Sequence, residues 1–311
     1  MHNHTDHHKD ISTSREDNKR LMRLATYVAV AVAGSLVSIK FVAWIMTDSV
    51  SLLSTMIDSL LDVAASTVNL FAIRHALQPA DEEHRFGHGK AEALAGLAQS
   101  AFISGSAMFL VIEAFDRIFH PRIIESFMVG YVVMVISIVA TLGLVIFQRY
   151  VAKKTGSLAI AADSTHYKMD ILVNISVILS LFLVSRFNWG ISDPLFAIGI
   201  AGYIFYGAYE IGIEAYHVLM DRELPDEDRD KIRDIAVSHK DVLDIHDLRT
   251  RSSGSDMFIQ LHLEMDPNIT LVRAHDIAEE VMHMIEKEFP RAEVLTHQDP
   301  HGADEQVAFE N

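Results

Sequence analysis

The chain has 311 residues, 50% of them hydrophobic, and a formal net charge of −16. It contains no cysteine, which excludes disulfides and thiolate metal sites, so any metal ion must be held by His, Asp or Glu. Between Met220 and Asn311 there are 23 acidic residues and 10 Lys or Arg, an imbalance that argues against nucleic-acid binding and suits the attraction of cations.

Residues 1–20 are polar and include four histidines: His2, His4, His7 and His8. We expect a disordered, solvated tail, because the segment has too little apolar surface to form a core. A weak metal-collecting role is the alternative. The apolar run that follows is too long for the core of a signal peptide, so no cleaved leader is expected.

Apolar segments, each long enough to cross a bilayer, follow this tail. They are Leu21–Met46, Ser51–Leu77, Ala91–Phe119, Phe127–Val151, Ser157–Arg186 and Pro194–Leu219. Residues 21–220 are therefore expected to form a domain of six transmembrane α-helices in a lipid bilayer. Lys and Arg concentrate before the first segment and after the second and fourth, which predicts that both termini are cytoplasmic.

After Leu219 the mixture of polar and apolar residues is typical of a soluble domain. Helical periodicity at Glu227–Ser238 and Thr270–Phe289 flanks alternating segments at Val242–Arg251 and Asp256–Met265, and Ala292–His297 reads as a last strand. Residues 221–300 are therefore predicted to form a cytoplasmic α+β domain in the order α-β-β-α-β. Residues 301–311 are expected to be a C-terminal tail.

Two of the apolar segments carry ionisable residues four apart, which places each pair on one face of a helix. Asp58 and Asp62 form the first pair, and His166 and Asp170 form the second. Inserting an ionised acid near the bilayer centre costs roughly 2.5 to 3.5 kcal/mol. Such residues are therefore expected to have a function. Side by side, the pairs offer three carboxylates and one imidazole, a set that suits a tetrahedral divalent cation such as zinc. The alternative is that they only pair with polar neighbours and fix helix packing.

Two further groups of candidate ligands lie outside the apolar segments. Asp81, His84 and His88 are spaced to wrap one ion at a helix entrance; the alternative is a polar loop with exposed histidines. His246, His262 and the closing His297-Gln298-Asp299 run could converge at one edge of the predicted sheet, and His275 could reach the strand face from its helix. A lone histidine on a strand is nevertheless more often structural.

Several segments together resemble the cation diffusion facilitator family, and most of all its bacterial ferrous-iron/zinc efflux branch. They are Asp58–Asp62, Gln78–Asp81, Phe86–Glu92, His166–Asp170, Leu219–Arg222, His246–Arg251 and His297–Pro300. The resemblance implies a homodimeric zinc/proton antiporter of the bacterial inner membrane with a metallochaperone-like cytoplasmic domain. The chain departs from the family pattern mainly at Glu82 and Glu83, after Asp81.

The resemblance also implies roles for individual residues. The transport site is expected at Asp58, Asp62, His166 and Asp170, and the loop site at Asp81, His84 and His88. A binuclear site at the cytoplasmic dimer interface is expected from His246, His262, His297 and Asp299, with His275 and Gln298 beside it. Lys90 and Asp221 are expected to form a salt bridge between protomers.

Metal binding needs deprotonated ligands, so loading of the intramembrane site should expel protons and proton entry should expel metal. The ligand set favours Zn²⁺ and also admits Cd²⁺, Fe²⁺ or Mn²⁺ as transported ions. A passive divalent-cation channel is one alternative. A membrane metalloenzyme is another, although His84 and His88 form only one histidine box and there is no His-Glu-x-x-His run.

Overall fold

The computed structural model describes residues 4–47, 50–119, 128–187, 191–254 and 256–302. The chain forms two compact units, one up to Tyr216 and one from His217 onward. The first is helical and the second combines helices with a sheet, so the predicted fold class is confirmed.

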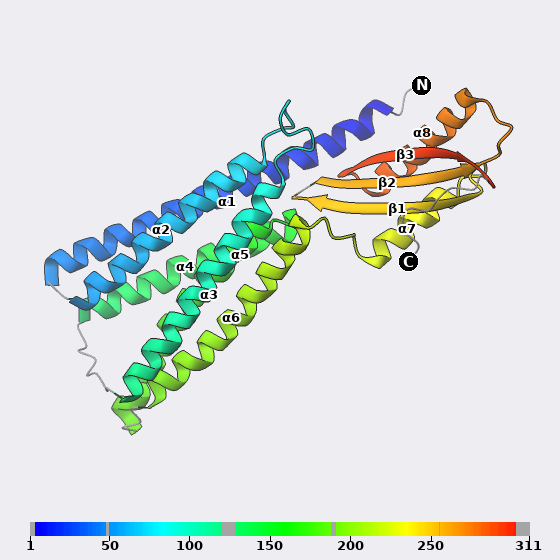
Figure 1. Cartoon of the computed structure of the whole chain (residues 1–311). Helices are drawn as coiled ribbons and strands as arrows, with labels where there is room; N and C mark the ends of the chain where they lie inside the picture. Colours follow the sequence, from blue (N-terminus) through cyan, green and yellow to red (C-terminus); the bar gives the residue numbers. More distant parts are fainter. Residues whose placement is uncertain (1–3, 48–49, 120–127, 188–190, 255, 303–311) are drawn as a thin grey trace. The chain divides into compact units, whose positions relative to one another are not determined.

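Long helices make up the first unit (Figure 1). They are α1 (His4–Thr47), α2 (Val50–Ala76), α3 (Lys90–Phe119), α4 (Met128–Thr155), α5 (Leu158–Phe187) and α6 (Ser192–Leu219). Within the described residues, five of the six are long and apolar enough to cross a membrane. The exception is α5, which carries Asp163, Lys168 and Asp170.

The start of α1 differs from the sequence prediction. The helix begins at His4, so residues 4–20, expected as a disordered tail, continue the first span. This stretch contains no proline or glycine, and extending an existing helix is much easier than nucleating one. Glu16 and Arg20, one turn apart, form an ion pair with 3.9 Å between Oε1 and Nε.

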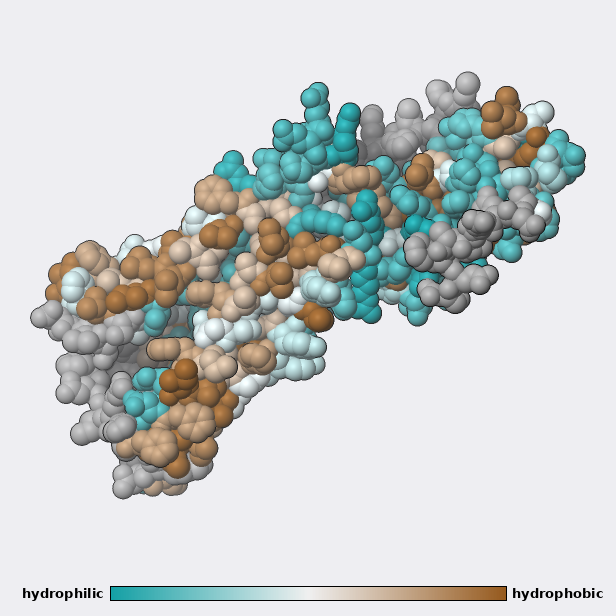
Figure 2. Space-filling model, in the orientation of Figure 1, coloured by the Kyte–Doolittle hydropathy of each residue, from teal (hydrophilic) through white to brown (hydrophobic). Residues whose placement is uncertain are grey.

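The helices of the first unit pack through small and aliphatic side chains and turn large apolar side chains outward. α1 packs against both α2 and α4, and α5 contacts α2, α3 and α4. Exposed apolar residues include Phe71, Phe109, Val139 and Ile146, and brown side chains cover much of the helical unit in Figure 2. Such a surface suits contact with lipid chains.

The second unit is a three-stranded sheet with two helices. Its elements are α7 (Asp226–Val237), β1 (Asp244–Ser253), β2 (Asp256–Met265), α8 (Leu271–Glu288) and β3 (Ala292–Pro300). The strand order is β1-β2-β3, with β1 antiparallel and β3 parallel to β2. Thr270 caps α8 by accepting a hydrogen bond from the backbone N–H of Arg273.

One face of the sheet forms the core of this unit. Ile259, Leu261 and Leu263 of β2 are buried there in a single cluster with Ile277 and Val281 of α8. Because side chains alternate along a strand, the intervening residues of β2, among them His262 and Glu264, belong to the opposite face. The alternation therefore separates an apolar core face from a face that carries histidines and acids.

Three candidate metal-binding clusters

The first cluster lies in the helical unit, between α2 and α5. Ligand atoms of Asp62, His166 and Asp170 all lie within 4.8 Å of one another. His166 Nε2 is 3.0 Å from Asp62 Oδ1, and the buried imidazole contacts the rings of Phe102 and Tyr167. Helical spacing on α5 and the packing of α5 against α2 thus bring one imidazole and two carboxylates close together.

Asp58, the fourth expected ligand, lies one turn before Asp62 and is exposed outside this three-residue cluster. A cation from α1 faces these acids: Lys40 interacts electrostatically with Asp58, Asp62 and Asp170. Its ammonium donates hydrogen bonds to Ser59 Oγ at 2.6 Å and to the carbonyl of Thr55 at 3.2 Å. Acids in an apolar environment need a compensating cation, and α1 supplies one to the acids of α2.

A buried polar network lies beside the first cluster and was also missed. Asp163, on α5, accepts a hydrogen bond from Gln148 Nε2 at 2.6 Å and one from Ser66 Oγ at 3.5 Å. The Ser66 hydroxyl lies 2.7 Å from that of Tyr167. The network joins α2, α4 and α5, and its signal in the sequence is an acid within an apolar segment, three residues before His166.

The second cluster lies in the loop between α2 and α3. Asp81 Oδ1 accepts backbone hydrogen bonds from Glu83 at 3.0 Å and His84 at 2.6 Å. The backbone hydrogen bond from His84 is the main reason that the pKa of Asp81 lies below its usual value. His84 Nδ1 is 3.3 Å from Oδ1, and His88 Nε2 is 3.3 Å from Oδ2. All three predicted loop residues are therefore brought together.

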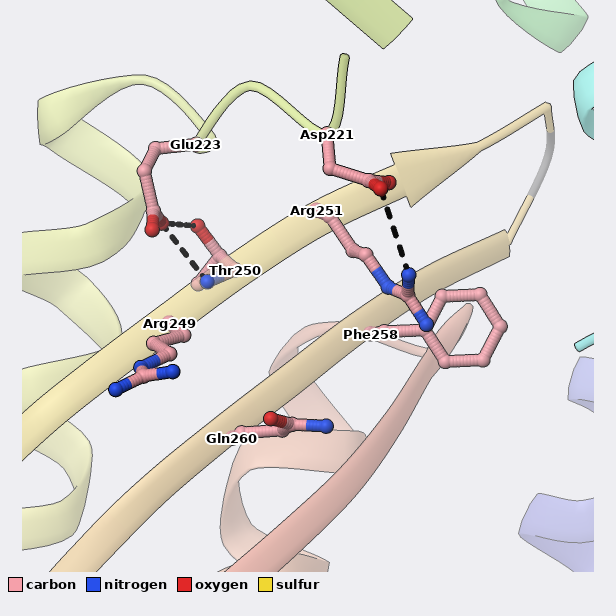
Figure 3. Close-up of a pocket in the computed structure, with 7 residues that line it drawn as sticks. All are labelled: Asp221, Glu223, Arg249, Thr250, Arg251, Phe258 and Gln260. Carbon is pink, nitrogen blue, oxygen red and sulfur yellow. Dashed lines mark hydrogen bonds and ion pairs between the residues drawn. The ribbon is translucent and has the colours of Figure 1, made fainter. Parts of the chain in front are cut away.

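Asp221, the cytoplasmic partner expected for Lys90, follows α6 with a φ of 55°. In the second unit its carboxylate lies 3.6 Å from Arg251 Nη1, and the Arg251 guanidinium stacks 5.0 Å from the centre of the Phe258 ring. Figure 3 shows these side chains lining a pocket of about 300 Å³, where Glu223 also accepts a hydrogen bond from the backbone N–H of Thr250 at 2.8 Å. The Lys90–Asp221 pair between protomers stays a prediction.

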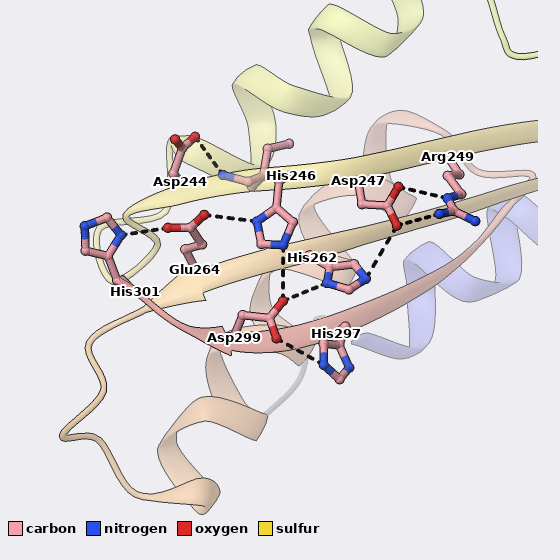
Figure 4. Close-up of polar contacts among 10 residues, drawn as sticks. Asp244, His246, Asp247, Arg249, His262, Glu264, His297, Asp299 and His301 are labelled. Carbon is pink, nitrogen blue, oxygen red and sulfur yellow. Dashed lines mark hydrogen bonds and ion pairs between the residues drawn. The ribbon is translucent and has the colours of Figure 1, made fainter. Parts of the chain in front are cut away.

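The third cluster lies on the sheet face opposite the core (Figure 4). Asp299 Oδ2 lies 2.7 Å from His262 Nδ1 and 3.5 Å from His246 Nε2, while Oδ1 lies 3.1 Å from His297 Nε2. His246, His262 and His297 occupy paired positions on β1, β2 and β3. Strand register therefore gathers three imidazoles around one carboxylate whose side chain is only 4% exposed.

Additional side chains surround this cluster and were missed. Glu264 Oε1 lies 3.0 Å from His246 Nδ1, and its Oε2 lies 2.7 Å from His301 Nδ1. Asp247 Oδ2 is 3.9 Å from His262 Nε2 and 2.9 Å from Arg249 Nη2. Carboxylates in these positions fix the orientation and tautomer of metal-binding histidines. Glu264 could have been found from its place two residues after His262 on the same strand.

His275 and Gln298 do not join the third cluster within one chain. The His275 side chain, on α8, is 65% exposed and lies 3.5 Å from Glu279. Gln298 pairs in register with Leu263, whose side chain is in the core, so it lies on the face opposite His297 and Asp299. Their expected places at the site therefore stay predictions.

Known proteins match the chain over nearly its whole length. The family described as the cation efflux transmembrane domain matches residues 26–220, and the cation efflux protein cytoplasmic domain matches residues 224–301. The cation-efflux pump FieF of Klebsiella pneumoniae subsp. pneumoniae is 49% identical over 281 residues, which cover 90% of this chain and 93% of that protein. The FieF pump of Yersinia pestis (strain Pestoides F) is 50% identical over the same shares. A solved structure described as the zinc form of CzrB is 27% identical, with 28% of this chain matched to 99% of that one and a TM-score of 0.26.

Proposed function

Because this chain belongs to the cation diffusion facilitator family of cation-efflux transporters, we propose that it exports a divalent cation, zinc by preference, in exchange for protons. It is a multi-pass membrane protein with a cytoplasmic C-terminal domain, and its relatives are bacterial, so we place it in the bacterial inner membrane. The observation that carries the proposal is the convergence of Asp62, His166 and Asp170 between helices α2 and α5 of the helical unit.

Zinc is the preferred substrate because the site combines one imidazole with carboxylate oxygens. Asp58, one turn before Asp62, would provide the fourth ligand when the ion enters. Lys40 would balance the acids while no ion is bound, since it lies in the field of Asp58, Asp62 and Asp170. Cd²⁺, Fe²⁺ and Mn²⁺ are further substrates that the oxygen-rich set would admit.

Proton exchange follows from the chemistry of the ligands. His166 must be neutral, and Asp62 and Asp170 ionised, before they can bind a divalent cation, so loading releases protons. Proton entry from the opposite side would then release the ion. Rocking of the helices around the site between α2 and α5 would expose it to each side in turn.

The other two clusters would serve cytoplasmic metal. Asp81, His84 and His88 would form a loop site, and three histidines with Asp299 would form a site on the sheet, since their side chains lie close together. We propose that the cytoplasmic domain mediates a homodimer. Its acidic surface would repel a second copy, and metal bound at the sheet would offset that repulsion.

The test is zinc transport into proteoliposomes that enclose a zinc indicator and a pH probe. Asp62→Ala should abolish both zinc movement and the opposite proton movement. Glu210→Gln is the matched control, because Glu210 is an exposed acid of membrane helix α6 outside the cluster. Normal coupled flux in the Asp62 variant would refute the assignment. Zinc flux without proton movement in the unmodified chain would favour a passive channel.

A further inference from the structure

A third imidazole lies beside the loop cluster but does not belong to the three-residue set. His75 is in the last turn of α2, before the loop that carries Asp81, His84 and His88. The centre of its ring lies 4.5 Å from that of His88, and the ring of His84 lies 4.6 Å from His88. Two imidazoles from different parts of the chain thus contact His88.

His88 is a buried side chain with an unsatisfied atom. Its side chain is 4% exposed, and Nε2 lies 3.3 Å from Asp81 Oδ2. Among the described residues, its Nδ1 is buried without a hydrogen-bond partner. Buried polar atoms of native proteins nearly always have a partner. His88 therefore lacks one polar contact, and its ring is the one that both His75 and His84 contact.

The distances among Asp81, His84 and His88 suit a tetrahedral ion. Ligand atoms about 2.0 to 2.1 Å from zinc lie about 3.3 Å from each other, and imidazole rings on one ion have their centres about 5 Å apart. The two nitrogen–oxygen distances at Asp81 are 3.3 Å, and the ring separations around His88 are 4.5 and 4.6 Å. Three ligands leave one corner of the tetrahedron open. His75 is exposed, so rotation of its side chain can turn a nitrogen to that corner.

We propose that His75 is the fourth ligand of the loop site, which then holds a divalent cation with three imidazoles and one carboxylate. This inference rests on the proposed metal-binding role of Asp81, His84 and His88. A four-ligand site without an open position is typical of a resident ion rather than a reacting or passing one. The ion would join the last turn of α2 to the loop that leads into α3. Helix α2 also carries Asp58 and Asp62.

The chain contains no cysteine, which makes a ligand-exchange experiment specific. The full-length protein in nanodiscs carries Asp62→Ala and His262→Ala, so that the other two clusters are disabled, and Co²⁺ alone is the probe. His75→Cys should give a near-ultraviolet thiolate-to-cobalt charge-transfer band, because only that position could provide a thiolate. Absence of this band, with Co²⁺ still bound at the loop, would overturn the proposal.

Further variants in the same background distinguish ligation from packing. His75→Phe keeps a ring beside His88 but removes its nitrogens, so zinc affinity should fall by about tenfold or more and the tetrahedral Co²⁺ spectrum should weaken. Arg74→Ala, the exposed neighbour on α2, is the control and should change neither. If His84→Ala lowers affinity but His75→Phe does not, His75 is not a ligand. If neither variant alters binding, the loop site itself is refuted and this inference with it.

Discussion

Replacement of Asp299 by asparagine is the most informative perturbation of the cytoplasmic domain. The buried carboxylate of Asp299 contacts His262 at 2.7 Å, His297 at 3.1 Å and His246 at 3.5 Å. Asp299→Asn preserves the shape of the side chain but removes its negative charge. The three imidazoles would then share a neutral amide, which is a much weaker ligand for a divalent cation.

The size of the effect follows from the place of the carboxylate among the three histidines. Replacing a partner that orients metal-ligating histidines typically costs about 10- to 100-fold in metal affinity. Asp299 lies within 3.5 Å of a nitrogen of each of the three histidines. We therefore expect the Kd for zinc to rise by a factor toward the upper end of that range.

The assay is a competition titration of zinc against a chromophoric chelator. It uses the full-length protein with Asp62→Ala and His84→Ala, so that only the sheet cluster binds tightly. Asp276→Asn is the control, since Asp276 is an exposed acid on α8 that faces away from the cluster. An unchanged zinc affinity in Asp299→Asn would refute the reasoning that this carboxylate unites the three histidines.

Three other predictions concern the transport site and the stability of the cytoplasmic domain. His166→Asp should reduce the preference for zinc over manganese in vesicle uptake, because the site would then offer only oxygen; an unchanged preference would contradict this. Hydrogen bonds from Arg273 lower the pKa of Asp241 and, after the contribution of His239, that of Glu280. Their stabilisation is therefore present above the ordinary carboxyl pKa of about 4 and is lost as pH falls through the lower folded-state values. Hydrogen-exchange protection of α8 should be weaker in Arg273→Ala than in the parent at pH 7, and equal protection there would count against the network. Ile277→Ala should destabilise the domain by about 2 to 5 kcal/mol in chemical denaturation because Ile277 is fully buried; a loss below about 1 kcal/mol would contradict that packing.

Local sequence patterns predicted the elements and part of each cluster. Apolar length gave the membrane helices, and alternation gave the strands. The four-residue spacing predicted that Asp58 and Asp62 share one helix face and that His166 and Asp170 share another. It could not show that Asp58 would lie outside the converged group, because the rotation of one helix against its neighbour depends on packing along the whole span.

Partners that come from distant parts of the chain were beyond the same reasoning. Lys40 reaches the acids of α2 from another helix, and no pattern within either helix specifies that approach. His301, which follows β3, meets Glu264 of β2 because the two strands pair in register. The sheet face of Gln298 could have been predicted from the sequence, since alternation along the strand places it opposite His297. His75 was not, because the loop must fold back before His88 can contact α2.

We propose that metal and protons exchange across the membrane through the cluster between α2 and α5. The most direct measurement imposes a pH gradient, acidic inside, on proteoliposomes with equal zinc concentrations on both sides. An exchanger should drive zinc inward against its developing gradient while protons leave, and Asp62→Ala should show neither movement. Zinc that stays at equal concentrations despite the pH gradient, in protein shown to bind it, would contradict exchange through this cluster.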